Sequence, residues 1–248
     1  KMESYTSVGM SIRTQQKKYG NSAGANLEYA KLNSHLKDSV FSVKQYFTNL
    51  LPIANFNYNF TKAKSVRIDY STSTSQPSVR QLQPVKDISD PLNISAGNPA
   101  LKQSYTHNAS LQFFNASQAK QKNLFIFLNY TGTRNAIVGS DVISSSGTRT
   151  SMPVNANGVY NLLANIEHGF RVKKLKTRFD AGISMNFSRS VNFINAEKNK
   201  TGIFSVMPRL SANYSYKEVL DIEAVARVSY NDARYSLQPS FNNEYWRQ

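Results

Sequence analysis

The chain has 248 residues, with 30 lysines and arginines against 15 aspartates and glutamates, which gives a formal net charge of +15. It contains no cysteine, which excludes disulfide scaffolds, zinc ribbons and thiol enzymes. Its mean hydropathy is -0.47 and it has no run of about 18 apolar residues, which excludes a transmembrane helix but not transmembrane strands. A hydrophobic content of 40% is too high for a disordered chain.

Hydrophobic residues recur with a period of two along most of the chain, which is the period of a β-strand. In 179–188, for example, Phe179, Ile183 and Met185 share one face, and Asp180 and Asn186 take the other. The same alternation is present in 8–13, 25–31, 54–60, 66–71, 109–113, 124–130, 160–167, 209–214 and 220–231. No window shows a helical period. We therefore predict about 10 strands, each with an apolar and a polar face.

The connections between these strands are expected to alternate in length. Short ones fall near 17–22, 61–64, 115–122, 171–176 and 215–218, and long ones near 34–46, 75–104, 136–157 and 189–202. Turns at one end and long loops at the other are typical of outer-membrane barrels, whereas a soluble sandwich mixes loop lengths at both ends. The prediction is an all-β fold, a transmembrane antiparallel up-and-down β-barrel segment, in preference to a soluble β-sandwich.

Five tyrosines lie near the ends of predicted strands. They are Tyr58, Tyr70, Tyr130, Tyr214 and Tyr230. In a barrel they would form interface belts, with each ring in the apolar layer and each hydroxyl toward water.

The basic residues gather at the short connections. Eleven of the 30 lysines and arginines lie there, namely Lys17, Lys18, Lys62, Lys64, Lys120, Lys122, Arg171, Lys173, Lys174, Lys176 and Lys217. Such a ring suits anionic head groups, or serves only for solubility. It is not a groove with stacking aromatics, so we expect no nucleic-acid partner.

The longest predicted loop carries the most specific motifs. They are Tyr70-Ser71, Gln76-Pro77-Ser78, Gln81-Leu82-Gln83-Pro84, Asp90-Pro91-Leu92-Asn93 and Gly97-Asn98-Pro99-Ala100-Leu101-Lys102. Together with Pro52 before a strand, this segment resembles the TonB-dependent outer-membrane receptors of Bacteroidota-type bacteria, in the outer-membrane β-barrel family. The resemblance is specific over 50–114 and rests on strand alternation elsewhere.

The resemblance implies a function in transport. Receptors of this kind import scarce nutrients, such as iron chelates or oligosaccharides, through a barrel of about 22 strands that a plug domain fills. Residues 1–248 would then be a partial outer-membrane β-barrel domain, a C-terminal barrel fragment of a longer protein without the plug and the N-terminal regions. The implied location is the outer membrane of a Gram-negative cell.

The resemblance also implies the partners. They are the lipid bilayer with its lipopolysaccharide, the TonB complex acting through the missing plug, and a small-molecule or glycan ligand. No cofactor is expected.

The loop itself can be interpreted without the resemblance. Its four prolines and Gly97 favour an irregular backbone that does not pair as a strand. Its apolar residues indicate that it packs on another part of the protein, and they are Val79, Leu82, Val85, Ile88, Leu92 and Ile94. The loop is then either a structural cap or a direct contact for the ligand.

The candidate ligand-binding residues follow from the expected direction of each side chain. The loop candidates are Asn98, Arg149 and Asn155. On the lumen face they are Arg67, Asp69, Arg209, Glu223 and Arg227.

Two other classes of function share the strand pattern. A passive porin or adhesin barrel has the same strands without a plug. An outer-membrane protease of about ten strands would need a His–Asp pair at the extracellular rim. The histidines are His35, His107 and His168, and no spacing joins one to Asp38, Asp87 or Asp90. No catalytic motif is present, so we expect neither an enzyme nor a metal site.

Overall fold

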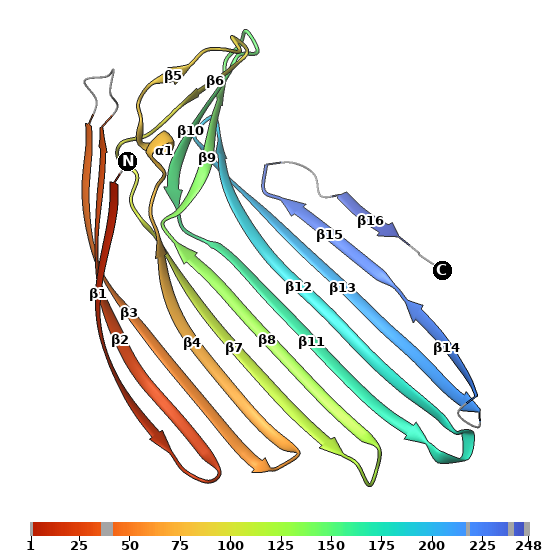
Figure 1. The fold of residues 1–248 in the computed structure, drawn as a ribbon. Helices are drawn as coiled ribbons and strands as arrows, with labels where there is room; N and C mark the ends of the chain where they lie inside the picture. Colours follow the sequence, from red (N-terminus) through yellow and green to blue (C-terminus); the bar gives the residue numbers. More distant parts are fainter. Residues whose placement is uncertain (1, 36–41, 217–218, 238–240, 246–248) are drawn as a thin grey trace.

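The computed structural model describes residues 2–35, 42–216, 219–237 and 241–245. In this part of the chain the strands join into one 16-stranded sheet. Figure 1 shows it as an open, curved wall of tilted strands, with β1 at one edge and β16 at the other. No helix among the described residues is long and apolar enough to cross a membrane.

The wall is an antiparallel meander in chain order. Its strands are β1 (Met2–Gln15), β2 (Tyr19–His35), β3 (Ser42–Thr61), β4 (Lys64–Ser75), β7 (Ser104–Ser117), β8 (Lys122–Arg134), β11 (Val159–Val172), β12 (Thr177–Ile194), β13 (Glu197–Tyr216), β14 (Leu220–Arg227), β15 (Ser229–Tyr235) and β16 (Phe241–Tyr245). Strands β14 and β15 both pair with β13 and are separated only by Val228. They therefore act as one interrupted strand of the wall.

The other elements lie beyond one end of the wall, apart from a 3₁₀ turn (Lys173–Leu175) at the opposite end. They are α1 (Val79–Leu82), β5 (Lys86–Asp87) and β6 (Asn93–Ala96) in the β4–β7 loop, and β9 (Ala136–Ile143) and β10 (Arg149–Ala156) between β8 and β11.

The register separates apolar from polar side chains across the whole wall. One row of paired residues runs Ile68, Leu111, Leu128, Ala164, Met185 and Val206 from β4 to β13. A neighbouring row on the other face runs Ser71, Asn108, Thr131, Asn161 and Ser188. We call the first the outward face and the second the lumen face.

The outward face is apolar and yet uncovered. Met10, Ile12 and Val8 of β1 have 81%, 76% and 72% of their surface exposed, and Leu128 and Leu162 are also exposed. An apolar band of this extent indicates contact with lipid, as in outer-membrane barrels. The all-β outer-membrane barrel fold predicted from the alternation is therefore confirmed.

The predicted loop lengths hold for the described short connections and for one of the long ones. Four described short connections lie together at the lower end in Figure 1, and the β4–β7 loop is long, as expected. The long loop expected at 189–202 is wrong, because β12 and β13 pair up to Ile194 and Glu197. Asn195 and Ala196 alone form the turn, both with positive φ. This is the two-residue turn that suits a hairpin, but the usual Asn-Gly pair is missing from the sequence.

The loop expected at 136–157 is also wrong, because it is the β9–β10 hairpin. Ile137 and Val138 are adjacent, as are Val142 and Ile143, so the period of two is lost. Asn135 and Gly158, with φ of 50° and 103°, lie where the chain leaves β8 and enters β11, and β9 pairs in parallel with the end of β12. The loop expected at 34–46 is mostly strand, since β2 reaches His35 and β3 starts at Ser42, and 36–41 lie outside the described residues.

The tyrosine belt is confirmed in part. Tyr70 and Tyr130 share the outward face one row from Ile68 and Leu128, near the end that carries the long loop. Tyr58 and Tyr214 lie near the short turns. Tyr230 was wrongly placed at an interface, because it pairs with Val206 in the middle of β13.

The ring of cations is present at the short-turn end. Nine of its members are exposed there, namely Lys17, Lys18, Lys62, Lys120, Lys122, Arg171, Lys173, Lys174 and Lys176. Lys64, at the start of β4, is half-buried with its Nζ over the Phe60 ring at 4.8 Å. Lys217 lies outside the described residues.

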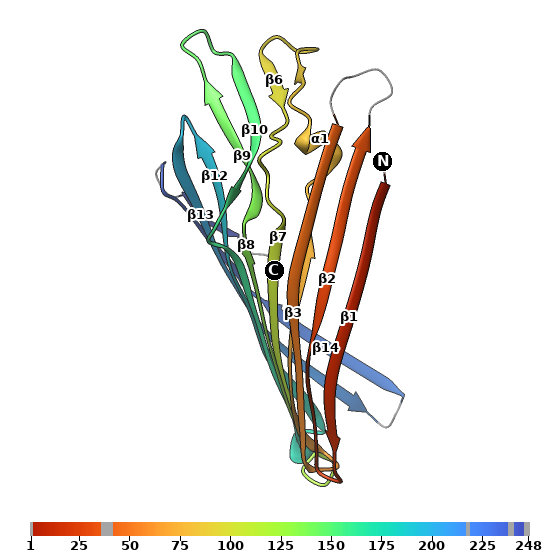
Figure 2. The same ribbon diagram turned by 90° about the vertical axis from the view of Figure 1, so that its left-hand side faces the viewer.

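The β4–β7 loop is fixed to the inner side of the wall. Its Leu82 and Leu101 form a buried cluster with Leu32 of β2, and Ile137 of β9 packs against it. Leu32 is on the lumen face, because Tyr29 and Lys31 face outward and successive residues of a strand point to opposite faces. Figure 2 shows α1 and β6 between the two arms of the curved sheet. The loop thus packs as expected, and it folds over the lumen.

Leu82→Ala should loosen this loop. The side chain is fully buried, and truncating a buried leucine to alanine costs about 2–5 kcal/mol. Limited proteolysis of the full-length protein in detergent should therefore cut 76–103 faster than in the wild type. Leu92→Ala is the matched control, since Leu92 is 61% exposed in the same loop. Equal cleavage of both variants would show that the leucine cluster does not hold the loop.

Candidate functional site

A large hollow lies between the β4–β7 loop and the β9–β10 hairpin. It has a volume of about 1040 Å³. One wall carries Arg80, Gln81, Gln83, Lys86 and Asp87 from the loop, and the other is the backbone and side chains of 137–139 with Ser151 and Pro153. The loop thus contributes the charged and amide side chains of the hollow, whose exposed lining is otherwise more apolar than polar, at the end of the wall that faces away from the short turns.

The loop wall is built by local hydrogen bonds. Ser78 caps α1, because its Oγ accepts from the Gln81 amide at 3.3 Å while the Gln81 side chain accepts from the Ser78 amide at 2.8 Å. Gly97 donates its amide to the Gln83 carbonyl at 2.9 Å. A Cβ on Gly97 would lie 2.7 Å from the Arg80 carbonyl oxygen, so only glycine allows this close backbone contact.

Two predicted ligand residues join the loop to the hairpin. Asn98 donates from Nδ2 to the Pro153 carbonyl at 3.0 Å, and its Oδ1 accepts from the Ala100 amide at 2.9 Å. Asn155 accepts from the Lys102 amide at 2.7 Å and donates to the Lys102 and Asn135 carbonyls at 2.9 and 2.8 Å. Both amides are therefore engaged in positioning the walls of the hollow.

Arg149 is paired across the hairpin. Its Nη2 lies 2.7 Å from Oδ2 of Asp141, which is mostly buried. Burial acts to raise the pKa of Asp141, but the hydrogen bonds from Arg149 and Ser151 outweigh it and hold that pKa below its usual value. The same pairing raises the pKa of Arg149. This predicted ligand residue thus fixes β9 against β10.

The lumen-face candidates form ion pairs along and across strands. Arg67 donates to Asp69 in a bidentate pair, with distances of 2.8 and 3.0 Å, and Asn55 of β3 also hydrogen-bonds to Asp69. Residues two apart on a strand share a face, which allows the pair. Arg209 lies 4.0 Å from Glu223, with Arg227 opposite Arg209 in the β13–β14 register.

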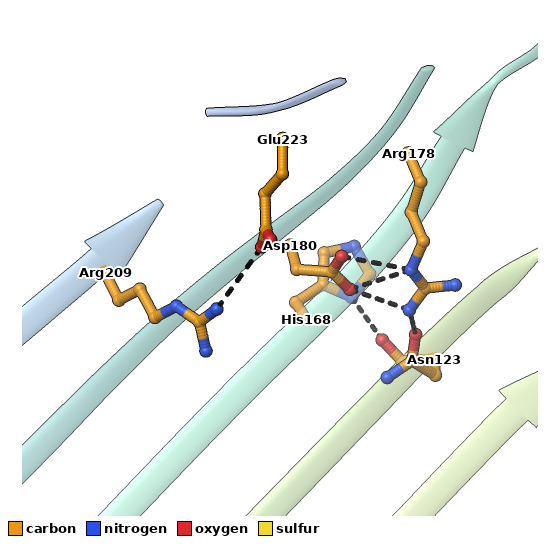
Figure 3. A network of polar contacts seen from close by, with 6 residues as sticks. All are labelled: Asn123, His168, Arg178, Asp180, Arg209 and Glu223. Atoms are coloured by element: carbon orange, nitrogen blue, oxygen red, sulfur yellow. Dashed lines mark hydrogen bonds and ion pairs between the residues drawn. The ribbon is translucent and has the colours of Figure 1, made fainter. Parts of the chain in front are cut away.

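A second polar cluster lies on the lumen face near the short turns (Figure 3). Arg178 donates to Asp180 in a bidentate pair, at 2.7–3.0 Å, and to the Asn123 side chain at 2.7 Å. Arg209 and Glu223 lie close to it, and with Asn123 and Asp180 they line a hollow of about 260 Å³. The sequence prediction included Arg209 and Glu223 but missed Arg178 and Asp180. Their spacing of two matches that of Arg67 and Asp69 and was a usable signal.

Gly169 is the floor of this cluster. It is buried, and a Cβ there would lie 2.4 Å from Arg178 Nη2 and from Asp180 Oδ1. The ion pair therefore lies directly over a residue without a side chain.

Neither His107 nor His168 is paired with a carboxylate in the part of the chain that the structure describes. His107 bonds through Nδ1 to the Tyr70 hydroxyl at 2.8 Å. His168 Nδ1 lies 2.9 Å from the Asn123 carbonyl oxygen. Among the described residues no group of three or more histidines and carboxylates could hold a metal ion. The side chain of His35 and all of Asp38 lie outside the described residues.

The sheet and its two faces define the chain as a wall of an outer-membrane barrel, and the sequence comparison gives the family. Residues 2–247 match the model of the outer membrane protein beta-barrel family. Since this match covers nearly the whole chain, the chain belongs to that family, and it is a protein of the outer membrane. No curated protein matches the chain.

Solved structures support the fold. The FrpB iron transporter from Neisseria meningitidis (F3-3 variant) aligns with a TM-score of 0.50 and 11% identity, over 93% of this chain and 37% of that one. The copper transporter OprC aligns with a TM-score of 0.50 and 8% identity, over 95% and 40%. The chain thus spans less than half the length of these proteins. At such identity the likeness shows a shared fold.

The Asp141–Arg149 pair predicts a pH dependence of the hairpin. The pKa of Asp141 is lowered in the folded state, so its contribution to stability is present above its ordinary pKa and is lost as the pH falls through the lowered one. Amide hydrogen exchange in β9 and β10 should therefore increase, relative to β12, as the pH falls from about 4 to about 2. In Asp141→Asn this pH-dependent step should be missing. An identical step in the variant would mean that another group titrates.

Gly169→Ala should disturb the lumen cluster. The new methyl group displaces Arg178 from Asn123 and should lower the free energy of unfolding by about 1 kcal/mol, the net contribution of one hydrogen bond. Gly182→Ala is the matched control, because a Cβ there has no neighbour nearer than 3.6 Å. Urea unfolding of the full-length protein in detergent measures both. Equal stability of the two variants would contradict the proposed role of Gly169.

Proposed function

We propose that the chain is part of a TonB-dependent outer-membrane receptor of the Bacteroidota type, which imports a scarce nutrient such as an iron chelate or an oligosaccharide. The observation that carries the proposal is the β4–β7 loop, which has the motifs of such receptors and folds inward over the lumen face. A loop in that position can hold a ligand at the entrance of a barrel. The fold shared with an iron transporter and a copper transporter is consistent with it.

The proposed mechanism starts at the hollow between loop and hairpin. Arg80 has 86% of its side chain exposed, and Lys86 is exposed as well, so both cations are available to a ligand. Asp87 lies 3.8 Å from Arg80 and offsets part of the charge. Guanidinium and ammonium groups beside amides favour a ligand rich in oxygen and negative charge, and thus an anionic chelate over a neutral sugar.

The ligand would then pass along the lumen face. There it meets the ion pairs of Arg67 with Asp69 and of Arg178 with Asp180, and then Arg209, Glu223 and Arg227. In the proposal a plug domain closes this lumen until the TonB complex displaces it. Residues 1–248 form a partial, C-terminal barrel domain of that receptor, which has no enzymatic activity and no cofactor of its own.

A passive porin or adhesin is the alternative from another class of function. It shares both faces of the wall but needs no energy supply. A protease of the outer membrane is a weaker alternative. Such an enzyme needs a histidine paired with a carboxylate, whereas the His107 side chain hydrogen-bonds to the Tyr70 hydroxyl.

Energy dependence separates the receptor from the porin. A strain that lacks the gene for the full-length protein should lose uptake of at least one compound from a set of radiolabelled ferric chelates and oligosaccharides. Plasmid-borne wild type should restore that uptake, and deletion of TonB should abolish it again. Uptake that persists without TonB would identify a passive barrel instead.

The cations of the hollow give a sharper prediction. Arg80→Gln with Lys86→Gln should weaken binding of the transported compound by about a hundredfold, since each of the two cations removed costs about one charge-assisted hydrogen bond. Lys62→Gln, an exposed lysine at the short-turn end, removes charge elsewhere and should bind normally. Calorimetry on the full-length protein measures the affinities. Unchanged affinity in the double variant would place the ligand elsewhere on the receptor.

A further inference from the structure

A hollow of about 550 Å³ opens on the outward face, away from the lumen and from the proposed nutrient path. Its lining includes Tyr70, His107, Tyr130, Tyr160, Arg134 and Arg189. All of them are in phase with the apolar row of Ile68, Leu111 and Leu128, as the strand register shows. The hollow therefore faces lipid, just above the apolar band on the side of the long loop.

Aromatic rings form the body of this hollow. Tyr130 stacks on Tyr160, with ring centroids 6.4 Å apart, and Tyr160 contacts Phe187 at 5.7 Å. On the other side the Tyr70 hydroxyl is bonded to His107 at 2.8 Å, and the His107 ring is 4.9 Å from that of Tyr105. The rings are thus held by one another before anything binds.

Gly132 leaves the space between the two groups of rings. It is buried between His107 and Tyr160 in the register, and a Cβ there would lie 2.4 Å from the Tyr130 hydroxyl oxygen. The missing side chain allows Tyr130 to fold over the strand and makes the floor of the hollow backbone.

Two arginines form its upper edge. The Arg189 guanidinium lies over the Tyr160 ring, 4.6 Å from its centroid, and its Nε donates to the Gly158 carbonyl at 2.9 Å. Within the described residues its terminal nitrogens donate to no acceptor. Arg134 is exposed and forms no ion pair with any other described residue. The two positive charges thus stand on the outward face above the apolar band.

From this arrangement we infer that the outward face holds a binding site for the phosphorylated head group of an outer-leaflet lipid. The phosphate lies between Arg134 and Arg189, which provide charge-assisted hydrogen bonds. The sugar of the head group rests on the tyrosine rings, and the acyl chains continue down over Leu111, Leu128 and Leu162. The two arginines above and the apolar leucines below match a lipid with a charged head group and apolar chains. A soluble anion would use only the arginines. This inference does not depend on the proposed nutrient import.

Lipid retention tests the site. The full-length protein is purified in detergent, and bound lipid is measured by native mass spectrometry after addition of bisphosphorylated lipid A. Wild type should retain it, and Arg134→Gln and Arg189→Gln should each bind about tenfold more weakly, the effect of one charged hydrogen bond. The control is Lys122→Gln, which removes one positive charge from the outward face at the short-turn end. This variant should retain lipid A as wild type does.

Two further measurements keep the result interpretable. Arg189→Lys keeps the charge but not the planar contact with Gly158 and Tyr160, so binding should recover in part, and heat-modifiable gel mobility shows that each variant is folded. Dephosphorylated lipid A should bind at least about tenfold more weakly than the phosphorylated form. The inference is wrong if both lipids bind equally, if inorganic phosphate competes at millimolar concentration, or if the two arginine variants retain lipid as wild type does.

Discussion

A lipid environment offers no water to a peptide group, so every backbone N–H and C=O within it must find a partner in the protein. The long antiparallel ladders of this chain satisfy that requirement, and β12 and β13 pair without a break from Thr177 to Ile194. Their length follows from the same constraint. The strands continue past the apolar band until a turn or a bend can be exposed to water, as at Asn195 and at Asn135.

The same constraint bears on the two edges of the sheet. Among the described residues β1 pairs only with β2, and β16 only with β15. In lipid, the free backbone groups of these edges require further strands or each other. The apolar side chains of β1, such as Met10 and Ile12, show that this edge nevertheless belongs to the lipid layer.

The sequence predicted what depends on periodicity and could not predict what depends on bends. The alternation in 179–188 identified β12 and its two faces, because the polarity of each residue indicates which face its side chain takes. The hairpin at Ala136–Ile143 and Arg149–Ala156 was missed, because adjacent apolar pairs such as Ile137 and Val138 hide the period once both faces leave the membrane. The turn at Asn195 was missed because its second residue is alanine.

The candidate site shows the same division. The alternation of side chains along each strand placed Arg67, Asp69, Arg209 and Glu223 on the lumen face. This alternation can be followed from neighbouring residues alone. It did not show that Asn98 and Asn155 bond to backbone carbonyls of Pro153 and Lys102, because those contacts join residues more than fifty positions apart. Nor did it identify Gly169 or Gly132, whose roles depend on which neighbour's side chain lies above them.

The β9–β10 hairpin is anchored on both flanks. On one side the Ile143 amide donates to the Asn195 side chain at 2.8 Å and the Asn195 amide donates to the Asp141 carbonyl at 2.8 Å. On the other, the Arg149 amide donates to the Leu92 carbonyl at 2.8 Å, and β10 pairs with β6. Wall, loop and hairpin thus form a closed circuit of hydrogen bonds from β4 to β12. A ligand that wedges the loop away from the hairpin strains the whole circuit, so the mouth of this open sheet is stiffer than its free edges.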